Sequence, residues 1–241
     1  MVSKSLYQLQ EKSIDFPDPE SALKEPNGLL AIGGDLAPQR LLAAYNNGIF
    51  PWYSADDPIL WWSPNPRAIF YPKEFIPNQS LIKTIKRGNW TFELNKNFDT
   101  IIESCSKPRS SDNGTWLSPI MKQAYKALHQ LGYAHCVESY YKEELVGGLY
   151  GVTIGQVFCG ESMYYDRTDA SKLAFWALSQ HCADNGVQMI DAQVPNPHLN
   201  NLGANSVPRK NFIEQLKQYR DQKLDPLAFR SQTIELKPVN N

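Results

Sequence analysis

Three polar side chains within apolar segments could carry acid–base chemistry. Glu161 lies within VFCGESMYY, where a carboxylate is costly unless it is paired or positioned for use. Asp191 and Gln193 lie in MIDAQV, and the two-residue period of a strand predicts that both point to one face. An acid and an amide placed in this way can hydrogen-bond to each other and orient a polar substrate. The alternative is that all three residues occupy solvated faces of their strands.

A cluster of basic residues could bind phosphate groups. Lys83, Lys86 and Arg87 are spaced three to four residues apart on one side of an expected helix. The chain has 24 Lys and Arg against 25 Asp and Glu, a net charge of −1, so any nucleic-acid contact requires a local patch of this kind. The alternative is an ordinary solvated helix face.

Aromatic side chains are concentrated between residues 26 and 70. Trp52, Trp61 and Trp62 stand among several prolines, which fix φ and make the backbone rigid and mostly irregular. Large aromatics on rigid loops can present a preformed surface to a ring or a base. The alternative is that they fill the core of a loop-rich subdomain.

The elements that must position these residues follow from periodicity, caps and glycine stops. In the first part, a helix is expected between Asp35, interpreted as its cap, and Gly48. The second part is regular, with helices expected at 78–87, 95–106, 118–131 and 169–186 (the last capped by Asp169), a final helix from Pro208 or Arg209, and strands at 134–141, 144–154, 156–165 and 187–194.

This order predicts an α+β fold with a mixed, mostly antiparallel sheet, divided into a small N-terminal domain (1–66) and a second domain (67–241). The second domain matches the acyltransferase fold of the GNAT superfamily in its order of elements. An acetyl-CoA enzyme of that fold needs a glycine-rich loop for the pyrophosphate, yet no glycine stands between Gly160 and Gly186. Acetyl-CoA is therefore not the expected donor.

Bulk features exclude other classes of protein. No apolar run of about 18 residues predicts a membrane span, and the N-terminal segment lacks the apolar core of a signal peptide. The four cysteines form no C-x-x-C pair and the four histidines are scattered, so no metal site is expected. We expect a reduced, cytoplasmic protein.

The chain resembles the leucyl/phenylalanyl-tRNA–protein transferase family over nearly its whole length. The matching blocks, in order, are EPNGLLAIGGDL, GIFPWYS, PILWWSPNPRA, GTWL, GYAH, ELVGGLYGV, FCGESMYY, DASK and IDAQVPNPH. The resemblance implies a cytosolic enzyme, with no cofactor, that transfers Leu or Phe from aminoacyl-tRNA to proteins beginning with Arg or Lys and so forms an N-degron. It also implies that the aminoacyl-adenosine end of the tRNA occupies the place of acetyl-CoA, which accounts for the missing glycine loop.

The resemblance further implies roles for individual residues. Asp191 and Gln193 resemble the catalytic pair, in which Gln193, oriented by Asp191, would hydrogen-bond the incoming amine, and Asp191 or a ribose hydroxyl would take the proton. Glu161 resembles the acid that holds the reacting or adenosine end. The resemblance also implies that Trp52 and Trp116 contact the adenine and that Trp61 and Trp62 fasten the two domains together. The pocket for the Leu or Phe side chain is expected at Leu149, Phe158, Phe175 and Ile190. Lys83, Lys86 and Arg87 are expected to contact the acceptor stem.

Two other functions stay open from the sequence. An ordinary GNAT N-acetyltransferase would bind acetyl-CoA, and a non-catalytic aminoacyl-tRNA-binding module would bind charged tRNA without transferring its amino acid. Pocket chemistry also predicts Met as a donor, since an apolar pocket that accepts Leu and Phe selects by shape.

Overall fold

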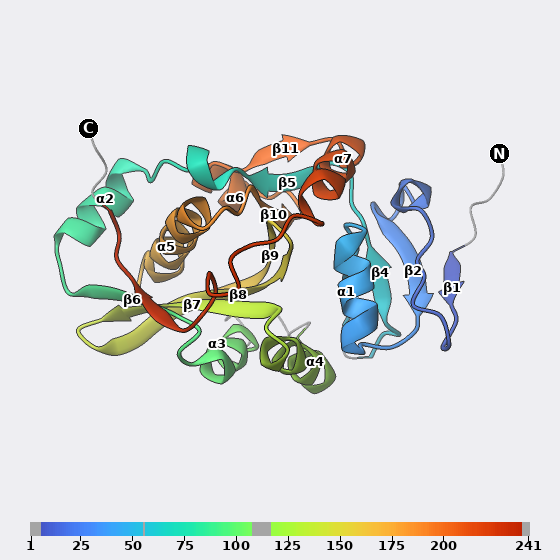
Figure 1. The fold of residues 1–241 in the computed structure, drawn as a ribbon, viewed down its shortest axis with the longest axis horizontal. Coiled ribbons are helices and arrows are strands. Elements are labelled where there is room, and N and C mark those ends of the chain that lie inside the picture. Colours follow the sequence, from blue (N-terminus) through green and yellow to red (C-terminus); the bar gives the residue numbers. More distant parts are fainter. Residues whose placement is uncertain (1–5, 55, 108–116, 238–241) are drawn as a thin grey trace.

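The strands form two separate sheets. The computed structural model describes residues 6–54, 56–107 and 117–237. Strands up to Trp62 form a four-stranded sheet of order β1-β2-β4-β3, and strands from Arg67 onward form an eight-stranded sheet of order β11-β5-β10-β9-β8-β7-β6-β12. The two sheets stand side by side in Figure 1, with helix α1 on the inner side of the smaller one. We retain the division at residue 66 as a proposal, and the change of sheet between Trp62 and Arg67 supports it.

The smaller sheet is built from short strands joined by glycine and proline turns. Its strands are β1 (Tyr7–Leu9), β2 (Leu29–Gly33), β3 (Phe50–Pro51) and β4 (Leu60–Trp62), with a short 3-10 turn η1 (Pro19–Ser21) and helix α1 (Pro38–Asn46). Helix α1 begins after Ala37 without a side-chain cap. The expectation that Asp35 caps this helix is wrong: Asp35 lies two residues before the N-cap position Ala37, and it accepts the Ala37 backbone N–H (2.9 Å) and an Arg40 N–H (3.2 Å).

The larger sheet is mixed. Strand β10 runs parallel to β9 and antiparallel to β5, and β7, β8 and β9 form an antiparallel meander. The predicted α+β class with a mixed, mostly antiparallel sheet is therefore confirmed. The strands are β5 (Arg67–Phe70), β6 (Trp90–Leu94), β7 (Ala134–Tyr141), β8 (Glu144–Ile154), β9 (Val157–Tyr165), β10 (Met189–Gln193), β11 (Asn205–Val207) and β12 (Gln232–Ile234).

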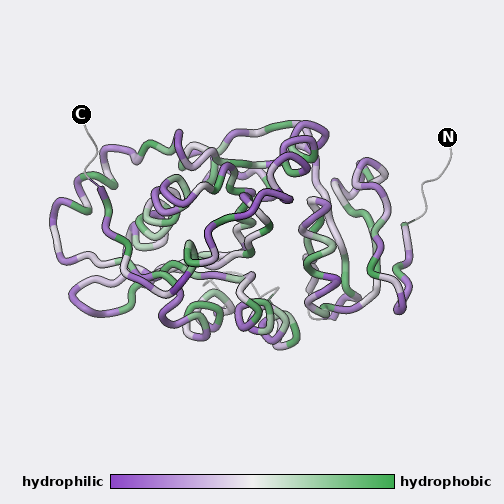
Figure 2. Tube along the Cα trace, viewed as in Figure 1, coloured by the Kyte–Doolittle hydropathy of each residue, from purple (hydrophilic) through white to green (hydrophobic). Residues whose placement is uncertain are grey.

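Helices cover both faces of this larger sheet. Helix α5 (Ala170–Asp184) packs on one face, and α3 (Phe98–Cys105) and α4 (Pro119–Gln130) pack on the other (Figure 1). Figure 2 shows hydrophobic and hydrophilic residues alternating along α3 and α4, as expected for helices with one buried side. The remaining helical segments are η2 (Pro72–Glu74), α2 (Gln79–Lys86), α6 (Pro197–Leu202) and α7 (Arg209–Tyr219).

Long periodic segments match their predictions best. Strands 134–141 and 144–154 are confirmed residue for residue, and Asn78 and Ser118 cap α2 and α4. Asp169 precedes α5 but gives its N-terminus no side-chain hydrogen bond. The predicted helix at 95–106 is too long, since the helix runs only from Phe98 to Cys105, and residues 90–94 before it pair with β7 as a strand. Strands of three to five residues (β5, β6, β11, β12) and helix α6 were missed, because so few residues carry no readable period.

Contacts of buried polar groups join the two sheets. The hydroxyl of Tyr45 on α1 lies 2.7 Å from that of Tyr125 on α4, and Arg209 at the start of α7 donates to the Ser63 carbonyl (2.6 Å). Trp61 is fully buried, but its own contacts, with the Phe16 ring and the Gly33 carbonyl, lie within the N-terminal part. Trp61 also belongs to a buried hydrophobic cluster that contains residues of both parts, and Trp62 packs against that cluster, so the expectation that Trp61 and Trp62 fasten the two domains stays a prediction.

Candidate active site

A cavity of about 540 Å³ opens where two strands of the larger sheet part. The parallel pairing of β9 with β10 ends at Cys159 and Asp191, although β9 continues to Tyr165. Beyond that point β10 has a bulge, because Asp191 and Gln193 face neighbouring residues of β5, Ile69 and Ala68. The cavity lies in the resulting gap, so one of its walls is Gly160 to Met163 of β9 and another is the stretch 192–194.

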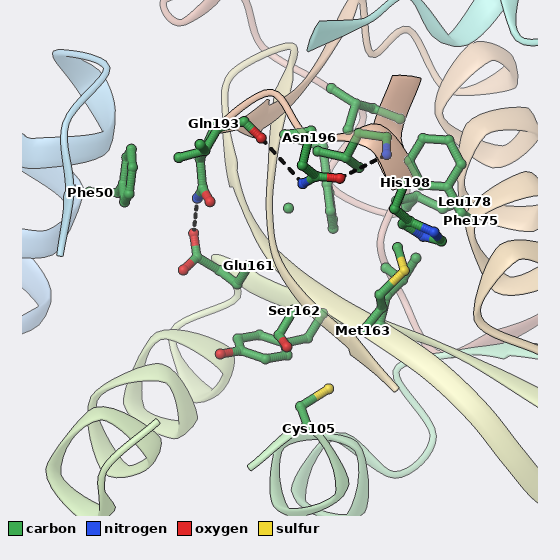
Figure 3. A pocket seen from close by; sticks show the side chains of 18 of the residues that line it. Phe50, Cys105, Glu161, Ser162, Met163, Phe175, Leu178, Gln193, Asn196 and His198 are labelled. Carbon is green, nitrogen blue, oxygen red and sulfur yellow. Dashed lines mark hydrogen bonds between the residues drawn. The ribbon is translucent and has the colours of Figure 1, made fainter. Parts of the chain in front are cut away.

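One end of the cavity is apolar. The four residues predicted for a side-chain pocket, which come from β8, β9, α5 and β10, all line it and are all buried: Leu149, Phe158, Phe175 and Ile190. Met163, Leu178 and Leu199 complete this end. In Figure 3, Phe175 and Leu178 lie across the cavity from Glu161 and Gln193. The structure thus brings together residues that are up to 41 positions apart in the sequence, from Leu149 to Ile190.

The other end is polar and centres on Glu161. Gln193 Nε2 donates to Glu161 Oε1 (2.8 Å), and the Tyr125 hydroxyl donates to Glu161 Oε2 (2.7 Å). Figure 3 shows the Glu161 and Gln193 side chains facing each other across the gap between the strands. Since Tyr125 donates to Glu161, its oxygen accepts from Tyr45, which makes a chain of four hydrogen-bonded side chains from α1 to β10.

Burial raises the pKa of Glu161 to about 7, well above the ordinary value of a glutamate. Hydrogen bonds from Tyr125 and Gln193, together with the nearby Tyr45 hydroxyl, favour the carboxylate and oppose this rise, and the charge of Asp191 adds to it. A carboxyl group with a pKa near neutrality can exchange protons at physiological pH, so Glu161 is suited to acid–base work.

Asp191 and Gln193 do not share a face. The Asp191 side chain is 1% exposed and points away from the cavity to Arg67, whose Nε and Nη2 donate to its two oxygens (2.8 and 2.6 Å). Gln193 has a left-handed backbone (φ 64°) at the bulge, which turns its side chain into the cavity. The expected side-chain pairing is wrong because the bulge breaks the two-residue period. Asp191 instead accepts the backbone N–H of Gln193 at Oδ1 (2.9 Å).

Trp52 stands at the cavity with 46% of its surface exposed. Its ring lies 5.7 Å from that of Trp62, whose Nε1 donates to the Trp52 carbonyl (2.6 Å). An exposed indole held in this way is free to stack on a planar ring. Its predicted partner Trp116 lies outside the described residues.

The three basic residues of α2 are exposed and lie outside the cavity lining. Thr84, between them, donates to Asp169 Oδ2 at the start of α5 (3.1 Å), which fixes the orientation of the helix. Lys83, Lys86 and Arg87 have no ion-pair partner among the described residues. They form an exposed basic patch, which we call the α2 patch.

Carboxylate, amide, hydroxyl, imidazole, thiol and aromatic groups line the cavity. Residues 6–54, 56–107 and 117–237 contain no group of three or more His, Cys, Asp or Glu side chains that could hold a metal ion. None of the four cysteines forms a disulfide. Within these ranges no helix has the length and apolar character needed to cross a membrane.

The family is decided by sequence matches that span the cavity and both sheets. A family model described as leucyl/phenylalanyl-tRNA protein transferase matches residues 69–217, and one for the N-terminal domain of the same proteins matches 34–65. A Shewanella piezotolerans protein named leucyl/phenylalanyl-tRNA–protein transferase is 54% identical over 222 residues, covering 92% of this chain and 94% of its own length. This chain belongs to the leucyl/phenylalanyl-tRNA–protein transferase family. A Shewanella pealeana protein of the same name is 51% identical over 96% of this chain and 99% of its own length.

Family membership confirms the resemblance found in the sequence and the prediction of an aminoacyltransferase. It favours transfer over the binding-module and N-acetyltransferase alternatives. Among solved structures, L-PGS from Bacillus licheniformis matches with a TM-score of 0.41 at 12% identity, over 69% of this chain and 53% of that chain. A GCN5-related N-acetyltransferase from Kribbella flavida matches with a TM-score of 0.39 at 10% identity, over 69% and 59%. These distant likenesses carry no argument, and the fold class rests on the strand order.

The structure adds three site residues that the sequence did not indicate. Tyr45 and Tyr125 fit the apolar spacing of their helices, so nothing distinguished them from core positions. Arg67 carried a usable signal, since an arginine next to the apolar run AIF requires a buried acid, and Asp191 in MIDA required a buried base. The arginine and the aspartate each indicate a buried partner of opposite charge.

Proposed function

We propose that this chain transfers Leu or Phe from aminoacyl-tRNA to the N-terminal residue, Arg or Lys, of acceptor proteins. The observation that supports it is a cavity in which an apolar end adjoins the hydrogen-bonded Glu161–Gln193 pair. Such a cavity can hold an apolar side chain at one end and an ester carbonyl with an attacking amine at the other. The relatives' name includes both leucyl/phenylalanyl-tRNA and protein, which supports these two substrates.

The donor side chain occupies the apolar end in this proposal. Leu149, Phe158, Phe175 and Ile190 accept a long, flexible or flat side chain, and Met fits for the same reason. Ile and Val branch at Cβ, close to the reacting carbonyl, and are disfavoured by shape. An apolar pocket discriminates between such side chains by about 1–3 kcal/mol, so transfer of Ile and Val is slower rather than absent.

The nucleic-acid part of the donor extends from the other side of the cavity. Trp52, on the exposed mouth, stacks on the terminal adenine, and we keep Trp116 as its expected partner. The α2 patch contacts phosphates of the acceptor stem. Since charged tRNA is found where translation takes place, the reaction belongs in the cytoplasm.

The chemical step is the attack of the acceptor's α-amine on the aminoacyl ester. The new C–N bond forms, the bond from the carbonyl carbon to the ribose oxygen breaks, the amine loses one proton and the ribose oxygen gains one. Gln193 hydrogen-bonds the amine and aims its lone pair, and Glu161 accepts the proton that leaves. Asp191 acts by orienting Gln193, since its own oxygens face Arg67 and the Gln193 backbone.

The enzyme has little deprotonation to do and much positioning. A free α-amine has a pKa of about 7.7–8, so on the order of a tenth is neutral at pH 7. A carboxylate with a pKa of about 7 matches this task. Correct placement of the two reactants can contribute up to about 7–11 kcal/mol. The Glu161 carboxylate also attracts the cationic N-terminal residue of the acceptor, the property that Arg and Lys share.

A transfer assay tests the function. Radiolabelled Leu-tRNA is incubated with the protein and two acceptors that differ only in an N-terminal Arg or Asp. We expect label in the Arg acceptor alone, and a loss of at least about 100-fold in Glu161→Gln, in line with the typical contribution of acid–base catalysis. Binding of Leu-tRNA without any transfer leaves only the binding module, and label from acetyl-CoA instead supports the N-acetyltransferase.

A further inference from the structure

Arg67 is a fully buried cation at the junction of the two sheets. Its side chain is 1% exposed, and its guanidinium carbon lies 5.0 Å from the centre of the Phe50 ring and 4.4 Å from that of Phe212. Phe50 belongs to β3 of the smaller sheet and also lines the cavity, whereas Phe212 belongs to α7. The guanidinium therefore lies between rings contributed by two distant segments of the chain.

The same guanidinium holds Asp191 in a fixed orientation. Two parallel N–H groups of Arg67 reach the two oxygens of Asp191, a bidentate geometry that sets the plane of the carboxylate. In that plane Oδ1 also accepts the backbone N–H of Gln193 (2.9 Å). Asp191 thus has no oxygen directed into the cavity.

The hydrogen bond from the Gln193 backbone N–H to Asp191 stabilises an unusual backbone conformation. Gln193 adopts φ 64°, a region that L-residues other than Gly, Asn and Asp rarely occupy, and it lies at the bulge of β10. Without a partner for its N–H, an extended backbone would be preferred, and the side chain would then turn away from Glu161. A contact that keeps this N–H occupied therefore also keeps the Gln193 amide in the cavity.

We propose that Arg67 is a positioning residue for aminoacyl transfer, acting on Gln193 through Asp191. This inference rests on the proposed function, in which Gln193 aims the attacking amine. Lysine cannot replace arginine at this position, because an ammonium group has neither the planar fork for the carboxylate nor the flat faces for two rings. The position of the Gln193 amide in the cavity thereby depends on the packing of Phe50 and Phe212 against the Arg67 guanidinium.

A double-mutant cycle tests the coupling. Arg67→Lys and Gln193→Ala are made singly and together, and single-turnover transfer is measured with saturating Leu-tRNA. We expect Arg67→Lys to lower the rate by on the order of 100-fold, the cost of misplacing a reacting group by about 1 Å. In the Gln193→Ala background the same change should cost less than about threefold, because its target is already absent. Binding of Leu-tRNA should stay within about twofold in every variant.

A control separates positioning from loss of a buried arginine. Arg40 is also 1% exposed and hydrogen-bonds carbonyls of the N-terminal part, at Ser13 and Glu11. Arg40→Lys should lower the thermal midpoint yet leave the single-turnover rate of the folded protein within about twofold. Equal losses from Arg67→Lys in both backgrounds would overturn the proposal, and so would a wild-type rate in Gln193→Ala.

Hydrogen exchange supplies a readout that does not require activity. The Gln193 amide should exchange at least about tenfold faster in Arg67→Lys than in the wild type, whereas Arg40→Lys should leave it unchanged. Asp191→Asn, which retains the side-chain volume, serves in the same measurements if Arg67→Lys does not fold. If the Gln193 amide exchanges at the same rate in Arg67→Lys as in the wild type, the role of Arg67 is contradicted but the proposed function is not. If the wild-type protein does not transfer the amino acid, the proposed function is contradicted instead.

Discussion

Glu161 combines properties that rarely occur together at one residue. It lies at a cavity wall, its pKa is raised to about 7 by burial, and two side chains donate hydrogen bonds to it. Desolvation and hydrogen bonding act on its pKa in opposite directions, so the protonation state at neutral pH depends on the donors. Of these donors, Tyr125 lowers the pKa of Glu161 most, so we expect it to determine the pH range in which Glu161 is ionised.

The Tyr125 hydroxyl can be tested by its effect on the pH profile. Tyr125→Phe removes a hydrogen bond that stabilises the carboxylate, so the pKa of Glu161 rises further above 7. In the proposed mechanism, single-turnover transfer depends on ionised Glu161. The rising limb of its pH profile should therefore move to higher pH by about one unit, with a loss of roughly fivefold at pH 7. The ionisation of the substrate amine is common to both enzymes and cancels in the comparison.

A second tyrosine–carboxylate pair provides the control. The Tyr140 hydroxyl donates to the buried Glu138 (2.6 Å), which lies outside the cavity lining. Tyr140→Phe should leave the rising limb where it is in the wild type. A pH profile that is the same in Tyr125→Phe and the wild type contradicts the role of Glu161 as proton acceptor.

At the scale of elements, the site depends on where strands stop pairing. The β9–β10 ladder ends at Asp191, and the bulge then carries Gln193 across the gap to Glu161. Helix α5 closes the apolar end with Phe175 and Leu178. Helix α2 contributes nothing to the cavity lining, and in the proposed function its exposed basic side contacts a different part of the substrate.

The α2 patch should affect tRNA binding without affecting the chemical step. Replacement of Lys83, Lys86 and Arg87 by Ala removes the positive charges that bind up to three phosphates, so the KM for aminoacyl-tRNA should rise on the order of tenfold or more. The dependence of log K on log salt should become shallower by about 0.9 for each phosphate that is no longer neutralised. Single-turnover rates at saturating tRNA should stay within about twofold.

Three exposed lysines elsewhere make a matched control for charge. Lys210, Lys217 and Lys223 lie on or just after α7 and also lack an ion-pair partner among the described residues. Their replacement by Ala removes the same formal charge and should leave KM and the salt slope nearly unchanged. Equal effects from the two triple variants would show that only the overall charge of the protein matters.

At the scale of the whole molecule, the cavity is complete only while the two sheets stay docked. The smaller sheet contributes Phe50, Pro51 and Trp52 to the cavity, so neither part forms the complete site. Helix α7 packs against the turn that follows α1, where Gly48 has φ +70°. A Cβ atom at Gly48 would lie 2.5 Å from Ile213 Cδ1 and 2.7 Å from Phe212 Cε1, so a larger residue here would have to displace these side chains.

Gly48→Ala should therefore destabilise the protein through both its backbone and its packing. The left-handed conformation costs about 1–2 kcal/mol and overpacking against α7 about 1–3 kcal/mol, so the free energy of unfolding should fall by roughly 2–5 kcal/mol. Gly132 has φ +79° with nothing within 4 Å of an added Cβ. Gly132→Ala should show the backbone cost alone, and equal losses in a denaturant titration would contradict tight packing at Gly48.

Much of the regular structure could be predicted from the sequence, since long segments repeat their apolar pattern. The eleven residues of β8 and the capped helix α4 carry enough period and punctuation to be identified without a structure. The residue types of the site could be identified as well, because Glu161, Asp191 and Gln193 stand out in apolar surroundings. Their mutual geometry could not, because it depends on one bulge that inserts a residue without any sequence mark.

By itself, the sequence determined the family, the α+β class and the chemical types in the site, because these depend on residue identity and local order. The tertiary structure alone decided which partner each polar group takes. Asp191 turned out to face Arg67, 124 positions away, rather than Gln193, and Gln193 turned out to face Glu161, 32 positions away. A buried charge is satisfied by whatever group the fold brings within hydrogen-bond distance, and that distance is set by strand pairing and sheet docking, not by spacing along the chain.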